Sequence, residues 1–484
     1  TFDLKYAETP SFDEESNTFT CKVEITNTGS VAGKGLAQVY VSLPYVSGSN
    51  VEKAHVVLGG FAKTEELAAG ASETVEITIN RDDLCSFDYK TDRCYILDAG
   101  DYNFYLSENA HSWASIDESD ADHCWTYTLD SKITYSENNP RPSDKVAAVT
   151  RYDDRTNYKF SDTAEEGKAL NFSRKDFAAT FPTEPSAAEC IADDQTLADL
   201  AKYDARARTE DLTETVMPVT ASNATSLQLI DLRGKDFDDE LWDQYMQQFT
   251  NESMYYMFRD GAWIEHADEA NGVPESIDMD GPYGFFGHSF TLYVNVWYCS
   301  EPVLAATFNP TLARKVGDAF GEEAHTQSTL LTGWYGPGCN IHRNAFCGRN
   351  YEYFSEDPVL SGIICAAETG GASEKGLICL TKHFALNNQE TNRQKVDTRM
   401  STRALREMYL KGFEIVVKEA HPWTVMSSYN KINGAYTQED PELLTTILRD
   451  EWGFDGIVMT DWTGTRNTKA QVHAQNDLME PGNE

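Results

Sequence analysis

The chain has 484 residues, of which 40% are hydrophobic and 12% aromatic, the composition of a folded protein with room for about three domains. Its formal net charge of −38 at pH 7 argues against a nucleic-acid partner, and no apolar run reaches the roughly 20 residues that span a membrane. Uncharged sugars match such an acidic surface better than phosphates do.

Residues 1–130 contain short β-prone runs separated by turn residues, which predicts an all-β sandwich. Val23 and Ile25, and then Val39 and Val41, alternate with polar neighbours, as expected for strands with one buried face. The clearest runs are FTCKVEITNTG, GLAQVYVSLP, SETVEITIN and DYNFYLSEN.

Residues 131–225 are dominated by Ser, Asp, Thr, Glu and Pro and show no periodicity. This composition predicts an extended linker that wraps over the protein surface. The segment is longer than a bare connection needs, so we expect part of it to be ordered against a neighbouring domain.

Residues 226–484 alternate helical stretches with short apolar strands. Asn309 and Pro310 supply a capping side chain and a first-turn proline for one helix, and Asp440 and Pro441 do the same for another. Strands are predicted in GLICLTKHF, WTVMSSY and GIVMTD. The repeated strand and helix pattern predicts a (β/α)₈ barrel, with a doubly wound sheet as the alternative.

Polar residues stand where the predicted strands end, and in a parallel barrel these ends meet at the active-site face. Lys382 and His383 end one strand, Tyr429 ends a second, and Asp461 ends a third and is followed by Trp462. Asp461 could attack an anomeric carbon while Trp462 stacks on a sugar, or Asp461 could cap the next helix. Lys382 and His383 could bind sugar hydroxyls or be satisfied by neighbouring carboxylates.

Two further polar residues lie outside the strands. Asp280 belongs to a DGP turn, which it could simply stabilise. Arg349 could contact a substrate or form a bidentate pair with Glu352.

No cofactor or metal is expected. The histidines form no HExxH motif, and no glycine-rich phosphate loop follows a strand. The ten cysteines are scattered without CxxC pairs, which indicates reduced thiols. Reduced thiols and the lack of a visible export signal favour the cytoplasm of a bacterium over secretion.

Five segments carry the identification of a family. In chain order they are DGPYG, GWYGPGCNIHRNAFCGRNYEYFSEDP, KHFALNNQE, VMSSYNKINGAY and GFDGIVMTDW. Together they resemble the barrel motifs of glycoside hydrolase family 3, and the resemblance covers residues 226–484. Residues 1–130 look like the fibronectin type III-like module of the same family, in NTGSVAGKGLAQVYVSLP and LGGFAKTEELAAG.

The resemblance implies a retaining, exo-acting β-glucosidase that removes terminal non-reducing β-D-glucosyl residues through a covalent glycosyl-Asp461 intermediate. The residues implied to hold the sugar or line its subsite are Asp280, Arg349, Lys382, His383, Met426, Tyr429 and Trp462. Family members that cleave N-acetylglucosaminides carry a histidine soon after the KHF motif, and this chain has none there. A β-xylosidase or related β-glycosidase is the alternative.

The second carboxyl group of the reaction is the point at which the chain departs from the family. Retention requires two carboxyl groups about 5–5.5 Å apart, one to attack and one to protonate the leaving oxygen. The family takes the second, a Glu, from an α/β sandwich domain, and no segment here resembles that domain. We therefore expect a missing domain or a second polypeptide to supply the acid/base Glu. Without it the chain would be a non-catalytic carbohydrate-binding protein.

Overall fold

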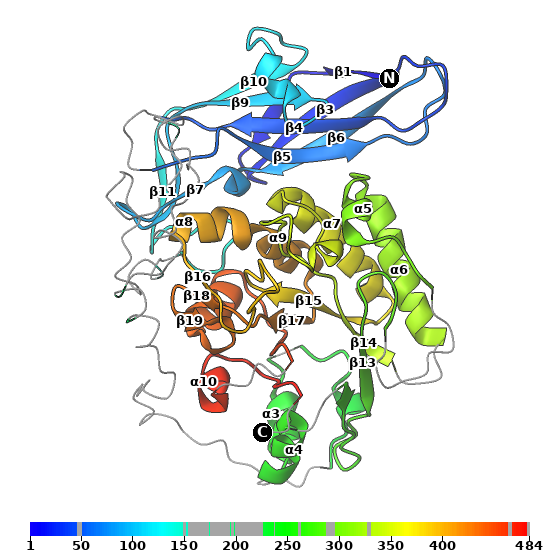
Figure 1. Ribbon diagram of the computed structural model, residues 1–484, viewed down its shortest axis with the longest axis vertical. Helices are drawn as coiled ribbons and strands as arrows, with labels where there is room; N and C mark the ends of the chain where they lie inside the picture. Colours follow the sequence, from blue (N-terminus) through cyan, green and yellow to red (C-terminus); the bar gives the residue numbers. More distant parts are fainter. Residues whose placement is uncertain are drawn as a thin grey trace.

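The computed structural model describes residues 1–45, 51–148, 226–236, 238–259, 263–286, 296–326, 331–462 and 467–481, with single positions 152, 174, 194 and 198. Figure 1 shows a β-rich part, coloured blue to cyan, lying against an α/β part, coloured green to red. Most of the linker predicted at 131–225 lies outside the described residues.

The β-rich part is built from two four-stranded antiparallel sheets that share one apolar core. The first sheet contains β1 (Phe2–Tyr6), β2 (Ser11–Asp13), β3 (Thr18–Asn27) and β6 (Ser72–Asn80). The second contains β4 (Leu36–Ser42), β5 (Val56–Lys63), β9 (Gly100–Ser107) and β10 (Cys124–Leu129). A smaller third sheet joins β7 (Ser86–Asp88), β8 (Cys94–Leu97) and β11 (Ile133–Tyr135). Each of the four β-prone runs contains one of these strands.

Alternating burial holds β3 in register. Every second side chain along β3 is buried, and Val23 and Ile25 are fully so. A slip of one residue against β6 would turn this whole apolar set towards solvent. The period of two read from the sequence is thus the cause of the observed pairing.

The α/β part is organised around a mixed six-stranded sheet. Its order is β12 (Ile264–Glu265), β13 (Ser276–Asp280), β14 (Leu331–Tyr335), β15 (Ile378–Phe384), β17 (Thr424–Ser427) and β20 (Ile457–Met459). The last five strands run parallel, whereas β12 is antiparallel to β13. A small second sheet contains β16 (Asp397–Thr398), β18 (Lys431–Ile432) and β19 (Ala435–Tyr436).

This arrangement corrects the prediction of an all-parallel sheet. Only a short connection separates β12 from β13, and within it Asp268 and Val273 form an antiparallel bridge. A parallel return needs a crossover of about a dozen residues or more, so the chain folds back antiparallel. Among the described residues the sheet has six strands.

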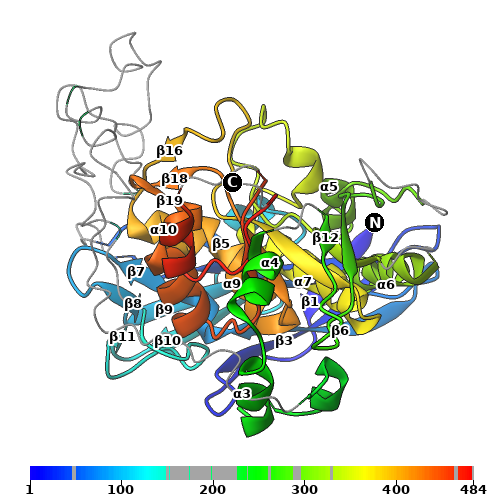
Figure 2. The same ribbon diagram turned by 90° about the horizontal axis from the view of Figure 1, so that it is seen from below.

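Helices cover the sheet. The helical segments are α3 (Glu240–Met246), α4 (Asn251–Arg259), α5 (Glu301–Ala305), α6 (Pro310–Thr326), α7 (Pro358–Glu374), α8 (Thr402–Ala404), α9 (Lys411–Ala420) and α10 (Thr468–His473). Two π-helical stretches are present, η9 (Leu405–Tyr409) between α8 and α9 and η11 (Glu442–Glu451), which lies where a helix was predicted after Asp440. The view in Figure 2 places α6 and α10 on opposite sides of this part.

Helix α6 begins and packs as its sequence suggests. The Asn309 side chain accepts a hydrogen bond from the Leu312 amide at 3.0 Å, as predicted for a cap. Gly317 faces α7 so closely that a Cβ there would lie 1.9 Å from the Glu368 carbonyl oxygen. A glycine at this position lets the two backbones touch.

The β-rich part packs firmly on the helices. Tyr40, Leu58 and Phe61 belong to the same buried cluster as residues of α7 and α9. An ion pair of 2.5 Å joins Lys411 to Asp83 across the same contact. The nine cysteines in the described part are all free thiols, in line with the sequence-based expectation, and no helix described there is long and apolar enough to cross a membrane.

Candidate active site

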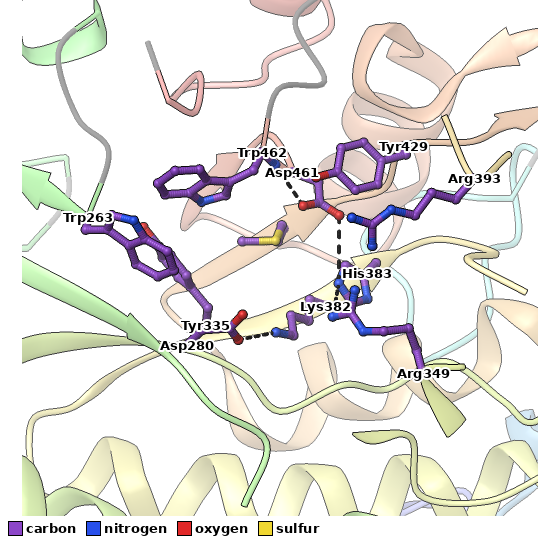
Figure 3. Close-up of a pocket in the computed structure, with 11 residues that line it drawn as sticks. Trp263, Asp280, Tyr335, Arg349, Lys382, His383, Arg393, Tyr429, Asp461 and Trp462 are labelled. Atoms are coloured by element: carbon purple, nitrogen blue, oxygen red, sulfur yellow. Dashed lines mark hydrogen bonds and ion pairs between the residues drawn. The ribbon is translucent and has the colours of Figure 1, made fainter. Parts of the chain in front are cut away.

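A cavity of about 380 Å³ opens where the parallel strands end (Figure 3). All eight site residues named from the sequence line it, and three further residues join them. The lining is Trp263, Asp280, Tyr335, Arg349, Lys382, His383, Arg393, Met426, Tyr429, Asp461 and Trp462. The strand-end reasoning selected five of these residues, namely Lys382, His383, Tyr429, Asp461 and Trp462, and they do meet in one place.

Asp461 follows β20 and projects into the cavity (Figure 3). Its Oδ1 accepts a hydrogen bond from the Trp462 amide at 2.7 Å, while its Oδ2 accepts none from the described residues within hydrogen-bond geometry. Burial raises the pKa of Asp461 to about 6, against the opposing charges of Arg349 and Arg393. A buried carboxylate with one oxygen left for a ligand is suited to nucleophilic attack.

His383 is held as a neutral imidazole. Burial lowers its pKa well below the usual value, and the Arg349 and Lys382 charges add to this. Its Nε2 lies 3.1 Å from Arg349 Nη2, which can only donate, and its Nδ1 lies 3.1 Å from the Tyr353 hydroxyl. These contacts assign the proton to Nδ1. Nε2 lies 3.8 Å from Asp461 Oδ2 and carries no proton to donate to it.

Arg349 pairs with Glu352 and also lines the cavity. Its Nε donates to Glu352, while its other end reaches His383 and the cavity. The ion pair with Glu352 orients the guanidinium, whose other end still lines the cavity.

Lys382 and Asp280 form the charged end of the cavity. The Lys382 ammonium donates to Asp280 at 2.7 Å and lies 3.3 Å from Glu352. Burial alone would raise the pKa of Asp280, but the Lys382 charge outweighs it and the pKa is lowered. Burial likewise opposes the charge of Lys382, yet Asp280 and Glu352 raise its pKa. Both groups are therefore charged at neutral pH and can exchange hydrogen bonds with sugar hydroxyls.

Tyr429 lies between Asp461 and Arg393 (Figure 3). The Arg393 guanidinium stands 4.5 Å from the centre of the Tyr429 ring. Burial raises the pKa of Tyr429, and the Asp461 charge adds to the effect, so its hydroxyl remains a donor at physiological pH. Met426, at 2% exposure, packs with Tyr335 in a buried cluster that Trp462 covers.

Sequence reasoning missed Trp263, Tyr335 and Arg393. Tyr335 ends the strand LTGWY, so the strand-end rule could have found it. Arg393 follows the KHF motif in a stretch without regular structure, and Trp263 precedes a strand of two residues, so no local signal marks either. Trp263 stacks on Trp462 at 4.5 Å and on Tyr335 at 5.1 Å between ring centres.

Only two of the lining residues are carboxylates, Asp280 and Asp461. Asp280 is engaged with Lys382, so the described lining offers Asp461 no second carboxyl group for proton transfer. The part of the chain that the structure describes also contains no cluster of three or more His, Cys, Asp or Glu side chains able to hold a metal ion.

The fold and this site define a glycoside hydrolase domain, and comparison with known families agrees. Residues 284–479 match the model of the glycosyl hydrolase family 3 N terminal domain, and residues 36–110 match the fibronectin type III-like domain. The chain therefore contains a domain of glycosyl hydrolase family 3, as the sequence motifs indicated.

Individual relatives share much of the chain. Beta-glucosidase A of Butyrivibrio fibrisolvens is 32% identical over 94% of this chain and 52% of its own length. An exo-alpha-(1->6)-L-arabinopyranosidase of Bifidobacterium longum is 43% identical over 46% of this chain and 30% of its own. The structure of a beta-glucosidase from Paenibacillus barengoltzii, 27% identical, superimposes with a TM-score of 0.74 over 99% of this chain and 50% of that one. The chain thus spans about half the length of these two beta-glucosidases.

Proposed function

We propose that the protein is a retaining, exo-acting β-glucosidase in which Asp461 forms a covalent bond with the terminal glucosyl residue. The observation that carries this is the buried Asp461 carboxylate at a strand end, with Oδ2 turned to the cavity and Arg349 and Arg393 nearby. The names of the relatives support the substrate class.

In the first step, Asp461 Oδ2 attacks the anomeric carbon and the bond from that carbon to the leaving oxygen breaks. Lys382 and Asp280 exchange hydrogen bonds with the sugar hydroxyls, and neutral His383 holds Arg349 beside them through its Nε2. The leaving oxygen takes its proton from a Glu outside the described lining, on another domain or polypeptide. In the second step, water activated by that Glu releases glucose from Asp461.

A second candidate is a glycosidase acting on a pentopyranoside, such as a β-xylosidase. The similarity to an arabinopyranosidase favours it, because arabinopyranose, like xylose, lacks the hydroxymethyl group of glucose. Without an acid/base group from elsewhere, the remaining candidate is a carbohydrate-binding protein with no turnover.

A 2-deoxy-2-fluoro-β-glucosyl fluoride tests the proposal, because fluoride leaves with little protonation and the fluorine at C2 slows the second step. Peptide mass mapping should find the label on Asp461. The Asp461→Ala protein should bind glucose in a calorimetric titration yet take up no label. Label on another residue would refute the assignment, and glucose binding by the unmodified protein without any label would favour the binding protein.

The proposal extends to the fold. We take the six-stranded sheet as part of a (β/α)₈ barrel within residues 226–484, joined through residues 131–225 to a β-sandwich at 1–130. The parallel strands β13, β14, β15, β17 and β20 support it, since their carboxyl ends surround the cavity as in such barrels.

Free cysteines support a reducing compartment such as the bacterial cytoplasm, and a count of ten reactive thiols in freshly isolated, denatured protein would test this location.

A further inference from the structure

One wall of the cavity is aromatic. Trp263 stands between Tyr335 and Trp462, with ring centres 5.1 and 4.5 Å away and planes tilted by 30° and 41°. All three rings pack on the buried cluster that contains Met426. Figure 3 shows Trp263 and Trp462 across the cavity from Arg349 and Arg393, so one side is apolar and the other cationic.

The wall runs from one end of the site to the other. Tyr335 is the register partner of Asp280 in the sheet, and Trp462 directly follows Asp461. Trp263 contacts both of these rings and lines the same cavity. A sugar ring held by Asp280 and facing Asp461 can therefore turn one edge to the Trp263 indole.

The backbone at Trp263 is held in an uncommon conformation. Its φ is +80°, in the left-handed region that a bulky side chain rarely adopts. Its carbonyl oxygen accepts a hydrogen bond from the Asp278 amide at 3.0 Å, which ties this conformation to β13. Strained residues of this kind persist where surrounding structure fixes them, often in ligand sites.

We propose that Trp263 determines specificity for the sugar by packing against the C5–C6 edge of the terminal glucosyl residue. This inference rests on the proposed function. A glucopyranose carries its C2, C3 and C4 hydroxyls on one edge and its C5–C6 hydroxymethyl on the other. The polar edge fits Arg349, His383 and Lys382, which leaves the hydroxymethyl methylene for the indole. Asp280, at the corner between these edges, can accept from the C4 and C6 hydroxyls together.

The predicted consequence is selectivity for glucosides over xylosides, which differ only by this hydroxymethyl group. Contact of one methylene group with an apolar wall accounts for about tenfold in selectivity. The experiment compares rates of Asp461 labelling by 2-deoxy-2-fluoro-β-glucosyl fluoride and by the matching xylosyl fluoride. Both probes bypass the acid/base group, so only the sugar differs.

Three variants sharpen the test. Trp263→Asn removes the ring but tolerates a left-handed backbone, and it should lower the glucosyl-to-xylosyl rate ratio about tenfold while xylosyl labelling continues. Trp263→Phe keeps a ring and should restore most of the ratio. Trp423→Leu removes a half-exposed indole before the amino end of β17, and it should leave the ratio unchanged.

An unchanged ratio in Trp263→Asn, with both probes slowed alike, would overturn the inference. The labelling rates can also be compared between probes that release dinitrophenolate and probes that release fluoride. If the loss of rate in Trp263→Asn depends on the leaving group, the inference is overturned and Trp263 contacts the aglycone instead. Absence of label from the unmodified protein with either sugar would instead refute the proposed function. Continued xylosyl labelling of Asp461 in Trp263→Asn shows that the fold is intact.

Discussion

The two carboxylates of the cavity should affect stability in opposite directions. Replacing Asp461 by Asn is expected to stabilise the fold at pH 7.5, because burial penalises the ionised carboxylate and raises its pKa to about 6. Replacing Asp280 by Asn is expected to destabilise the fold. The Lys382 charge lowers the pKa of Asp280, and Lys382 would lose this carboxylate as a partner. Each of the two substitutions removes one carboxylate charge from the same cavity.

The magnitude for Asp461 follows from its pKa. A rise from 3.8 to about 6 corresponds to about 3 kcal/mol, which is the upper limit of the stabilisation. The folded protein binds this proton more tightly than the unfolded chain does between about pH 4 and 6. Asp461 therefore reduces stability as pH rises through that window, and the penalty is complete above it. For Asp280 the contribution is favourable at neutral pH and is lost as pH falls through its lowered pKa.

Thermal denaturation of the three proteins at pH 7.5 and pH 4 measures these effects. Asp461→Asn should melt higher than the unmodified protein at pH 7.5, and the gap should close towards pH 4. Asp280→Asn should melt lower at pH 7.5. A lower melting temperature for Asp461→Asn at pH 7.5, or a gap that does not change with pH, would refute the account of burial at Asp461.

Other predictions concern rate and stability. The rate of Asp461 labelling by the fluoroglucosyl fluoride should fall as pH drops through about 6, because only the ionised carboxylate attacks; a flat profile from pH 7.5 to 4.5 would contradict this. Arg393→Met should move that midpoint upward, since the Arg393 charge lowers the pKa of Asp461, whereas an unmoved midpoint would exclude such an effect. Arg406→Met should destabilise the fold by about 3–5 kcal/mol, measured by denaturant unfolding, because it leaves the buried Glu451 without its bidentate partner at 2.7 and 2.9 Å. The double variant with Glu451→Met should recover part of that loss, and equal instability of the two would argue against an uncompensated charge.

Local patterns in the sequence predict the elements that carry chemistry. Alternating burial identifies β3, and apolar runs ending in polar residues identify β15, β17 and β20. Because parallel strands end at one edge, these runs also bring Lys382 and Asp461 into one site.

Features that depend on tertiary contacts escape such patterns. Nothing near Arg393 shows that its guanidinium will lie over the Tyr429 ring, and nothing near Trp263 indicates a left-handed backbone. The direction of β12 depends on the length of a connection, which hydrophobic periodicity does not report. The departures from the sequence-based expectation thus arise from contacts between segments and from the length of one connection.

In the proposed mechanism, the environment of Asp461 meets two demands on a nucleophile. A site that penalises the carboxylate charge favours attack, because the charge disappears when the glycosyl ester forms. The same carboxylate must leave again when water attacks, and the charges of Arg349 and Arg393 stabilise it at that stage. A pKa of about 6 satisfies both demands. Asp461 is mostly ionised at neutral pH, yet its arginine counter-ions do not stabilise the carboxylate so strongly that attack becomes unfavourable. His383 serves the same balance as a neutral acceptor, since a charged imidazole 3.8 Å away would tie up Oδ2.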